Sequence, residues 1–328
     1  MILVTGATGH VGNVLVRQLL ARGAQVRALV LPGEDAPSLQ GLEVERVEGD
    51  VLDPTTLERA MDGVEVVYHL AGVISILPGS EDIMRRVNVE GVRNVVNAAL
   101  KAGVRRLVHI SSIHAFKRVP SGTTLDETVP FAPDSPAGAY DRTKAEGTLA
   151  VLQAVRQGLD AVIVCPTGVI GPHDYLTSEM GQTILDFAKR KLHFLVDGAY
   201  DFVDVRDVAQ GLILAREKGR PGEVYILSGA HVKLVQLKKV VQEVVGVRSP
   251  AVVLPFGLAH LVATLSERFY RWTGATPRLT RYALRTVQES SDFRCDKARR
   301  ELGYTPRPLR DSIADTLAWW RHRWGCNK

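Results

Sequence analysis

The sequence predicts an α/β fold, a doubly wound parallel sheet with helices on both faces, joined to a smaller and mostly helical lobe. The first observation is an alternation of two patterns along the first half of the 328-residue chain. Short apolar runs typical of buried strands occur at residues 2–4, 26–30, 44–47, 64–70, 107–110 and 161–165. Between them, apolar residues recur near the helical period at residues 11–21, 54–61, 83–102 and 140–157. Strands that alternate with helices form parallel sheets through right-handed crossovers.

The second observation is the loss of this alternation after residue 166. The pattern predicts one helix at 184–191, short strands at 201–205 and 223–227, and mostly helix from 234 to 290. A last helix is expected to carry Trp319, Trp320 and Trp324. We therefore expect residues 1–165, with returning segments near 201–228, to form the sheet domain. Residues 166–200 and 229–328 are expected to form a discontinuous second lobe.

The third observation is a glycine-rich turn between the first strand and the first helix. Gly6, Gly9 and Gly12 lie in the segment TGATGHVG at residues 5–12. Glycines at these places let the backbone turn tightly and approach a pyrophosphate, which rests on the helix N-terminus. Because a strand precedes the turn and a helix follows it, we expect residues 1–165 to be a Rossmann-type dinucleotide-binding domain.

Composition excludes several other classes. The hydrophobic content of 45% and net charge of +5 are ordinary for a globular protein and too mild for a nucleic-acid binder. Three widely spaced cysteines make neither a disulfide framework nor a metal-ligand spacing, so we expect no metal and a cytoplasmic location. The chain starts with a strand, which leaves no room for a signal peptide. Its longest apolar stretch, residues 251–265, is too short and interrupted to span a bilayer.

Two strand ends bear on cofactor recognition. Asp50 closes the third apolar run, where its carboxylate can accept from an adenine amino group while the Val51 amide donates back; a plain turn-former is the alternative. The second run ends at Leu31 without the acidic residue typical of NAD sites or the cation that NADP requires. Arg27 lies too early in the strand to supply that cation. Its absence favours NAD, and NADP stays open.

A tyrosine and a lysine at helical spacing suggest a proton relay. Tyr140 and Lys144 are i and i+4 on a Pro-free helix, so they share a face. A phenol with a pKa of about 10 is a poor acid or base at neutral pH, and a nearby ammonium lowers that pKa. Ser111 and Ser112 end the fifth strand, where a hydroxyl can hold a reacting oxygen. With the glycine turn, these residues predict a nicotinamide-dependent redox enzyme.

At these motifs the chain resembles, nearly end to end, the extended short-chain dehydrogenase/reductase family of the NAD-dependent epimerase/dehydratase type. Further matching segments are HLAG at 69–72, NVEG at 88–91, ISS at 110–112, PTGVIGP at 166–172 and DFVDVRDVA at 201–209. The resemblance implies that Tyr140 is the general acid/base and that Lys144 binds the nicotinamide ribose and lowers the tyrosine pKa. It implies that Ser112, rather than Ser111, orients the substrate oxygen. The implied cofactor contacts also include Thr8, His10, Val11, Leu70, Ala71, Gly72, Pro166, Thr167 and Val169.

Within the family, the chain resembles the dihydroflavonol-reductase-like group, including hopanoid-associated enzymes called sugar epimerases, and the nucleotide-sugar epimerase/dehydratase group. Sugar-nucleotide members carry an arginine just before the Asp-Phe-Val segment, where this chain has Tyr200. An aromatic ring cannot replace a bidentate guanidinium on a diphosphate. Ile113 and His114 follow Ser112 where dehydratases have two carboxylates, which disfavours dehydration. The candidate substrate contacts are His114, His173, Tyr175 and Tyr200, with solvated histidines as the alternative.

We therefore predict an NAD(P)-dependent oxidoreductase that moves a hydride between nicotinamide and a secondary alcohol or ketone carbon of a small substrate. A sugar epimerase with tightly bound NAD and a non-catalytic dinucleotide sensor remain alternatives. The resemblance is compatible with a homodimer. Residues 255–272 join apolar residues to Arg268 and Arg271, which predicts a helix pair over the pocket; a further hypothesis is a lipid-like substrate that enters from a membrane surface.

Overall fold

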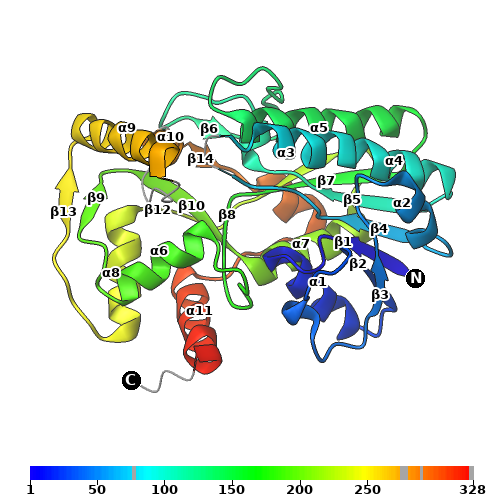
Figure 1. Ribbon diagram of the computed structural model, residues 1–328, viewed down its shortest axis with the longest axis horizontal. Helices are drawn as coiled ribbons and strands as arrows, with labels where there is room; N and C mark the ends of the chain where they lie inside the picture. The colour runs from blue at the N-terminus through cyan, green and yellow to red at the C-terminus, as the bar shows by residue number, and fades with distance from the viewer. Residues whose placement is uncertain (76–78, 274–279, 289–290, 325–328) are drawn as a thin grey trace.

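A seven-stranded sheet forms the larger part of the molecule in the computed structural model, which describes residues 1–75, 79–273, 280–288 and 291–324 (Figure 1). All its pairings are parallel, and the spatial order is β11-β7-β5-β4-β1-β2-β3. The strands are β1 (Ile2–Thr5), β2 (Val26–Val30), β3 (Glu45–Glu48), β4 (Val66–His69), β5 (Arg106–Ile110), β7 (Ala161–Pro166) and β11 (Val224–Leu227). The predicted fold class is confirmed.

Helices cover both faces of this sheet. α1 (His10–Leu20) and α7 (Val205–Lys218) pack together on one face. α2 (Pro54–Ala60), α4 (Val92–Lys101) and α5 (Ala139–Arg156) cover the other. The direction of strand order reverses at β1, which lies between β4 and β2. Ligands of doubly wound sheets bind in the crevice at such a point, outside the carboxyl ends of the strands.

The predicted boundaries agree closely with this sheet. Each of the six predicted strands is present within two residues of its expected ends. The predicted helix at 83–102 consists of α3 (Glu81–Arg85), a π-helical segment at Arg86–Gly91, and α4. The local hydrophobic period is a strong signal here because the inner strands are buried on both faces, whereas the edge strand β3 is largely exposed.

The smaller lobe is built from short strands and helices (Figure 1). Its helices α6, α8 and α11 surround the buried Trp320, and α9 and α10 enclose a second small core. Three strands form one sheet, in the order β12-β10-β8. Two strand pairs, β13-β9 and β14-β6, form separate small sheets. The bounds are β6 (Thr124–Leu125), β8 (Gly168–Ile170), β9 (Phe194–Val196), β10 (Ala199–Asp204), β12 (Ala230–Lys233), β13 (Val252–Leu254), β14 (Asp292–Phe293), α6 (Glu179–Ala188), α8 (Leu234–Val245), α9 (Phe256–Thr273), α10 (Arg281–Gln288) and α11 (Leu309–Trp324).

Two predictions for this lobe need correction. The helix predicted at 184–191 is α6, which begins earlier because the Ser178 side chain caps it by accepting from the Gly181 amide at 3.1 Å. Residues 255–272 form one continuous helix, α9, and not a helix pair; Gly257 lies in its first turn, where it does not break the helix. The structure does not describe the side chains of Arg268, Arg271 and Trp324. Among the described helices, none is both long and apolar enough to cross a bilayer.

Two histidines are buried side by side in the middle of the sheet. His69 on β4 and His109 on β5 are register partners, are at most 1% exposed, and have ring centroids 5.2 Å apart. His69 Nδ1 lies 2.7 Å from Thr5 Oγ1, whereas His69 Nε2 and both nitrogens of His109 lack a partner among the described residues. Burial, together with the Lys144 charge, lowers the pKa of His69 to about 3 and the pKa of His109 well below its ordinary value.

Replacing one of these histidines, as in His109→Phe, should make the fold less sensitive to acid. Unfolded histidine titrates at about pH 6.5, above the folded pKa, so the unfolded chain binds more protons and the unfolding free energy falls as pH drops below 6.5. His109→Phe should reduce this loss between pH 6.5 and 4.5 by roughly 2 kcal/mol. Urea unfolding at both pH values measures the difference in unfolding free energy, and His193→Phe, at an exposed histidine, is the control. If His109→Phe lost as much unfolding free energy between the two pH values as wild type does, the prediction would be contradicted.

Candidate active site

The glycine-rich turn brings the end of β1 against the end of β4. Gly6 has a φ of 67°, and a Cβ at this residue would lie 2.6 Å from the Ala71 amide nitrogen and 2.7 Å from the Leu70 carbonyl carbon. A Cβ on Gly12 would overlap the Gly6 carbonyl oxygen. Only glycine therefore permits both the backbone conformation and the close approach.

The N-terminus of α1 is open to an anion. Gly9 is its N-cap residue, no side chain caps the helix, and the first turn has no acidic residue. A Cβ on Gly9 would meet only the Gly6 carbonyl oxygen, at 3.4 Å. Free amides and the helix dipole favour a phosphate at such a terminus, so the turn fits the pyrophosphate of a dinucleotide.

Neighbouring contacts hold this turn in place. His10 Nε2 lies 3.0 Å from the Pro172 carbonyl oxygen, and Ser38 Oγ donates to the Thr8 carbonyl oxygen at 2.9 Å. Val11, only partly buried, packs against the core beneath. Two of the predicted cofactor residues, Thr8 and His10, thus connect the turn to distant loops.

Asn88 holds the turn that follows β4. Its Oδ1 accepts from the Val73 amide at 2.8 Å, and its Nδ2 donates to the Val73 carbonyl at 2.9 Å and to Thr143 Oγ1 at 3.3 Å. Thr5 Oγ1 accepts from the Ala71 amide at 3.2 Å on the same turn. The segment containing Gly72 is therefore fixed from both sides. The sequence motif included Asn88, but it was not assigned a role.

An acidic side chain reaches the end of β2, where none was expected. Glu34 Oε2 accepts from the amide of Leu31, which is 51% exposed, at 3.3 Å. Spacing along the strand could not reveal it, because Gly33, with a φ of 73°, turns the chain back after the strand. Arg27 points away, as expected, and pairs with Glu45 at 2.9 Å.

Asp50 makes a local turn at the end of β3. Its Oδ1 accepts from the Leu52 amide at 2.9 Å, and its own amide donates to Thr56 Oγ1 at 3.2 Å. The adjacent Val51 is buried and lies close to Gly91. The turn-forming interpretation is thus observed, and a contact with adenine remains a prediction.

The proton-relay residues meet at the end of β5. Tyr140 and Lys144 lie one turn apart on α5 and are at most 9% exposed. Lys144 Nζ donates to the Ile110 carbonyl oxygen at 2.9 Å, which ties α5 to the strand end. Ser112 lies near the Tyr140 hydroxyl, where it favours a lower pKa for that group, and its Oγ accepts from the His114 amide at 3.2 Å.

Ser111 is turned away from this group. Its Oγ lies 2.6 Å from Thr148 Oγ1, in the buried contact between β5 and α5. This geometry favours Ser112 as the hydroxyl that is available to a substrate. Cys165 is fully buried, and burial raises the pKa of its thiol to about 12, which agrees with a structural role rather than a nucleophile.

Burial dominates the protonation of the relay. It raises the pKa of the Tyr140 hydroxyl to about 12, and the nearby Ser112 side chain opposes this shift. It lowers the pKa of the Lys144 ammonium to about 8. Lys144 is not among the groups that shift the pKa of Tyr140 here, so the lowering by Lys144 that the resemblance implies stays a prediction. Tyr140 is therefore a protonated donor at neutral pH.

A second hydrogen-bond network lies beside Tyr140 and was not predicted as a unit. Tyr282 donates to Asp141 Oδ1 at 2.6 Å, and Arg118 donates to Asp141 Oδ2 at 3.0 Å. Because the only hydroxyl proton of Tyr282 goes to Asp141, its oxygen accepts from His114 Nδ1 at 3.3 Å. His114 Nε2 then accepts from the Tyr200 hydroxyl at 2.8 Å. The network can therefore take up one proton at His114.

Electrostatics keep this network neutral at His114. Burial lowers the pKa of His114 to about 4, although the Asp141 carboxylate opposes the shift. The ring of His114 lies edge-on to Tyr140, with centroids 5.8 Å apart. Gly168 leaves room for the Tyr200 ring, since a Cβ there would come within 2.5 Å of it. His114 and Tyr200, two predicted substrate contacts, thus lie next to the relay.

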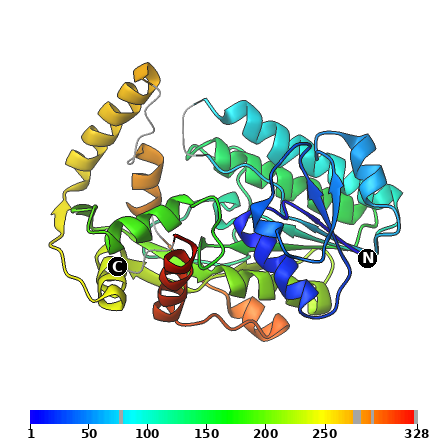
Figure 2. The ribbon, with the colours of Figure 1, turned by 60° about the horizontal axis from the view of Figure 1, so that its bottom comes forward.

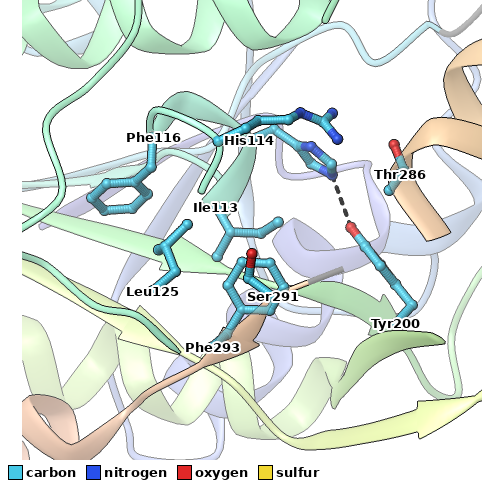
Figure 3. A pocket seen from close by; sticks show the side chains of 9 residues that line it. Ile113, His114, Phe116, Leu125, Tyr200, Thr286, Ser291 and Phe293 are labelled. Atoms are coloured by element: carbon cyan, nitrogen blue, oxygen red, sulfur yellow. Dashed lines mark hydrogen bonds between the residues drawn. The ribbon is translucent and has the colours of Figure 1, made fainter. Parts of the chain in front are cut away.

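A small cavity opens beside these residues (Figure 3). It has a volume of about 30 Å³, enough for one or two water molecules. A larger molecule therefore requires lining side chains to move. The lining residues are Ile113, His114, Phe116, Arg118, Leu125, Tyr200, Thr286, Ser291 and Phe293.

The other two predicted substrate contacts lie elsewhere. His173 and Tyr175 stack against each other and against Trp319 of α11, and Arg17 of α1 donates to the Tyr175 hydroxyl at 3.2 Å. His173 has a φ of 66°, which marks a tight bend. These side chains flank α1 rather than the cavity.

The turn after β7 is also held by buried polar contacts. Thr167 Oγ1 donates to Asp201 Oδ1 at 2.5 Å, and the Gly229 amide donates to the same oxygen at 2.9 Å. Val169, on β8, pairs with β10. Pro166 ends β7, so the predicted cofactor segment lies at the carboxyl edge of the sheet, where the motif spacing required it.

Comparisons with known proteins agree with this geometry. The model of the NAD-dependent epimerase/dehydratase family matches residues 2–228. The chain is 40% identical to sterol demethylase protein B of Methylococcus capsulatus, over 98% of each protein. It is 33% identical to 4-hydroxy-2-methyl-3-oxo-4-farnesyl-3,4-dihydroquinoline-1-oxide ketoreductase of Stigmatella aurantiaca, over 96% of this chain and 94% of that protein. The crystal structure of gox2253 superposes with a TM-score of 0.87 at 39% identity, over 98% of each chain.

The family model covers more than half of the chain, and the relatives match it nearly end to end. These relatives are enzymes by their names, and the predicted family is confirmed. The glycine turn, the Tyr140–Lys144 pair and the strand-end serines are therefore features of a member of the NAD-dependent epimerase/dehydratase family, within the extended short-chain dehydrogenases/reductases, to which this chain belongs.

Proposed function

We propose that the protein is an NAD(P)-dependent oxidoreductase that moves a hydride between nicotinamide and a secondary alcohol or ketone carbon, with Tyr140 as the general acid/base. The observation that carries the proposal is the buried group at the end of β5. There Ser112 lies near the Tyr140 hydroxyl and favours a lower pKa for it, and Lys144 donates to the Ile110 carbonyl oxygen one helical turn away. This group lies at the carboxyl edge of the sheet, as does the glycine turn.

Each residue has a distinct role in this proposal. A nicotinamide dinucleotide, when bound, would supply or accept the hydride. Tyr140 is protonated at neutral pH, so it donates its proton to the carbonyl oxygen during reduction. Ser112 holds the same oxygen by a hydrogen bond. Lys144 places a positive charge beside the strand end at pH values below about 8, which favours the phenolate left after transfer.

We further propose a lipophilic cyclic ketone or secondary alcohol as the substrate class, bound by residues 166–200 and 229–328. Four of the nine residues that line the cavity beside His114 are apolar: Ile113, Phe116, Leu125 and Phe293. The names of two relatives refer to a sterol and to a farnesylated quinoline, both largely apolar molecules. Tyr200, which replaces the diphosphate-binding arginine, is 7% exposed and donates to His114. That arrangement argues against a nucleotide sugar.

Tyr140→Phe should lower turnover by roughly a hundredfold or more, the scale of lost general acid–base catalysis, because the proton donor is removed. NADH oxidation with a panel of cyclic ketones that includes sterol-type 3-ketones measures it. NADH affinity should be unchanged, and Tyr175→Phe, outside the cavity, should keep wild-type turnover. Turnover of Tyr140→Phe within a few-fold of wild type would rule out its role.

We also propose a preference for NAD over NADP, based on Glu34. Its carboxylate lies 3.3 Å from the Leu31 amide, where it would accept from ribose hydroxyls and repel a 2′-phosphate. Glu34→Arg should shift the ratio of the NADPH and NADH dissociation constants toward NADPH by about tenfold or more, equivalent to about 1.4 kcal/mol. The neighbouring Asp35→Arg is the matched control. Equal shifts in both variants would point to net charge alone.

The same titration separates this proposal from an epimerase, which oxidises and re-reduces one carbon with a cofactor that stays bound. We expect purified protein to release little nucleotide on denaturation and to bind NADH exchangeably. Stoichiometric NAD that survives dialysis would favour the epimerase instead. A pure sensor role is disfavoured because Tyr140, Lys144 and Ser112 are all present.

A further inference from the structure

The outward face of α9 is more apolar than its buried face. Apart from Phe256, which is partly buried against the core, the residues that its described part turns inward are small or charged: Ala259 and Ala263 are fully buried, and Glu267 is 5% exposed and pairs with Arg281 of α10. An ordinary surface helix buries its bulky apolar residues instead. On α9 these bulky residues point to solvent at spacings of three and four, with exposures between 40% and 57%: Leu258, Leu261, Val262 and Leu265.

The neighbouring strands extend this apolar surface. Phe194 on β9 is the register partner of Val252 on β13, and these residues and Val253 are 47% to 60% exposed. β13 leads directly into α9. We call this surface the α9 patch; it contains Phe194, Val252, Val253, Leu258, Leu261, Val262 and Leu265. Seven of the thirteen large apolar residues exposed in the described part of the chain belong to it.

The position of the α9 patch suits a contact with an extended partner. Figure 2 shows α9, in yellow and orange, along the outer edge of the molecule at the end remote from the N-terminus. An exposed apolar surface of this extent marks an interaction site. α9 also packs against α10, which carries Tyr282 and Thr286 to the active-site network and cavity. The patch is therefore a neighbour of the pocket.

Charge identifies the kind of partner. Residues 234–288 contain eight Lys/Arg against two Asp/Glu, a net charge of +6, whereas the whole chain carries +5. Arg281 and Arg285 of α10 are exposed next to α9. Two copies of the chain that met through this lobe would repel each other, whereas an anionic lipid surface would attract it. Insertion of apolar residues between basic ones is the mode of interfacial helices.

We propose that the α9 patch, with the exposed Arg281 and Arg285 of the adjacent α10, binds the surface of an anionic lipid bilayer without crossing it. Leucine and valine side chains of α9 would lie at the headgroup boundary, and arginines such as Arg285 would contact lipid phosphates. The proposal rests on exposure and charge, so it does not depend on the proposed reaction.

Vesicle flotation of the full-length protein tests the proposal. We expect it to float with mixed phosphatidylcholine/phosphatidylglycerol vesicles at low salt, less with phosphatidylcholine alone, and less as salt is raised. Leu261→Glu should weaken partitioning by about tenfold or more, because one buried leucine is lost and a negative charge is added. Leu149→Glu, at an exposed leucine of α5, is the matched control and should bind like wild type. Arg285→Glu should weaken binding to the anionic vesicles only.

Three results would overturn the proposal. Wild-type protein that stays with neither kind of vesicle would do so, as would Leu261→Glu protein that floats like wild type. A dimer in sedimentation experiments that Leu261→Glu converts to monomer, without vesicle binding, would instead assign the patch to self-association. NADH titration of the same preparations checks that each variant is folded, and it keeps failure here distinct from failure of the proposed reaction.

Discussion

The site depends on a close contact between α5 and the π-helical segment that precedes α4. Gly147 makes this contact possible, because a Cβ there would overlap the carbonyl oxygen of Asn88. The same Asn88 holds the Val73 backbone through two hydrogen bonds and reaches Thr143 of α5. One contact therefore sets both the turn after β4 and the helix that carries Tyr140. A larger residue at position 147 would separate the proton relay from the cofactor turn.

Buried charge gives the pocket its polarity. Asp141 is fully buried, yet Arg118 and Tyr282 each donate a hydrogen bond to its carboxylate. Neither carboxylate oxygen is therefore buried without a donor. That charge directs the hydroxyl proton of Tyr282, and hence the tautomer of His114. Tyr200 in turn donates to His114. Tyr140 and this network thus lie side by side, next to the cavity that His114 and Tyr200 line.

The two parts of the molecule follow different physical rules. The inner strands of the sheet are covered on both faces and are largely apolar, and the buried His69 and His109 among them remain neutral. In the smaller lobe the cores are small, and α9 uses alanines to pack inward. The leucines of α9 lie on its outer surface instead. The α9 patch adjoins α10, which carries Thr286 to the cavity that the proposed substrate would enter.

The sequence by itself determined the sheet, the glycine turn and the spacing of Tyr140 and Lys144, because these follow from local period and from backbone conformations that only glycine adopts easily. Tertiary structure decided the rest. Glu34 reaches the end of β2 only through a turn, and Tyr282 meets Asp141 across 141 positions of sequence. His173 and Tyr175 follow the expected motif but pack beside α1. A helix's period predicts that one side is apolar; only its neighbours decide, as for α9, whether that side faces the core or the solvent.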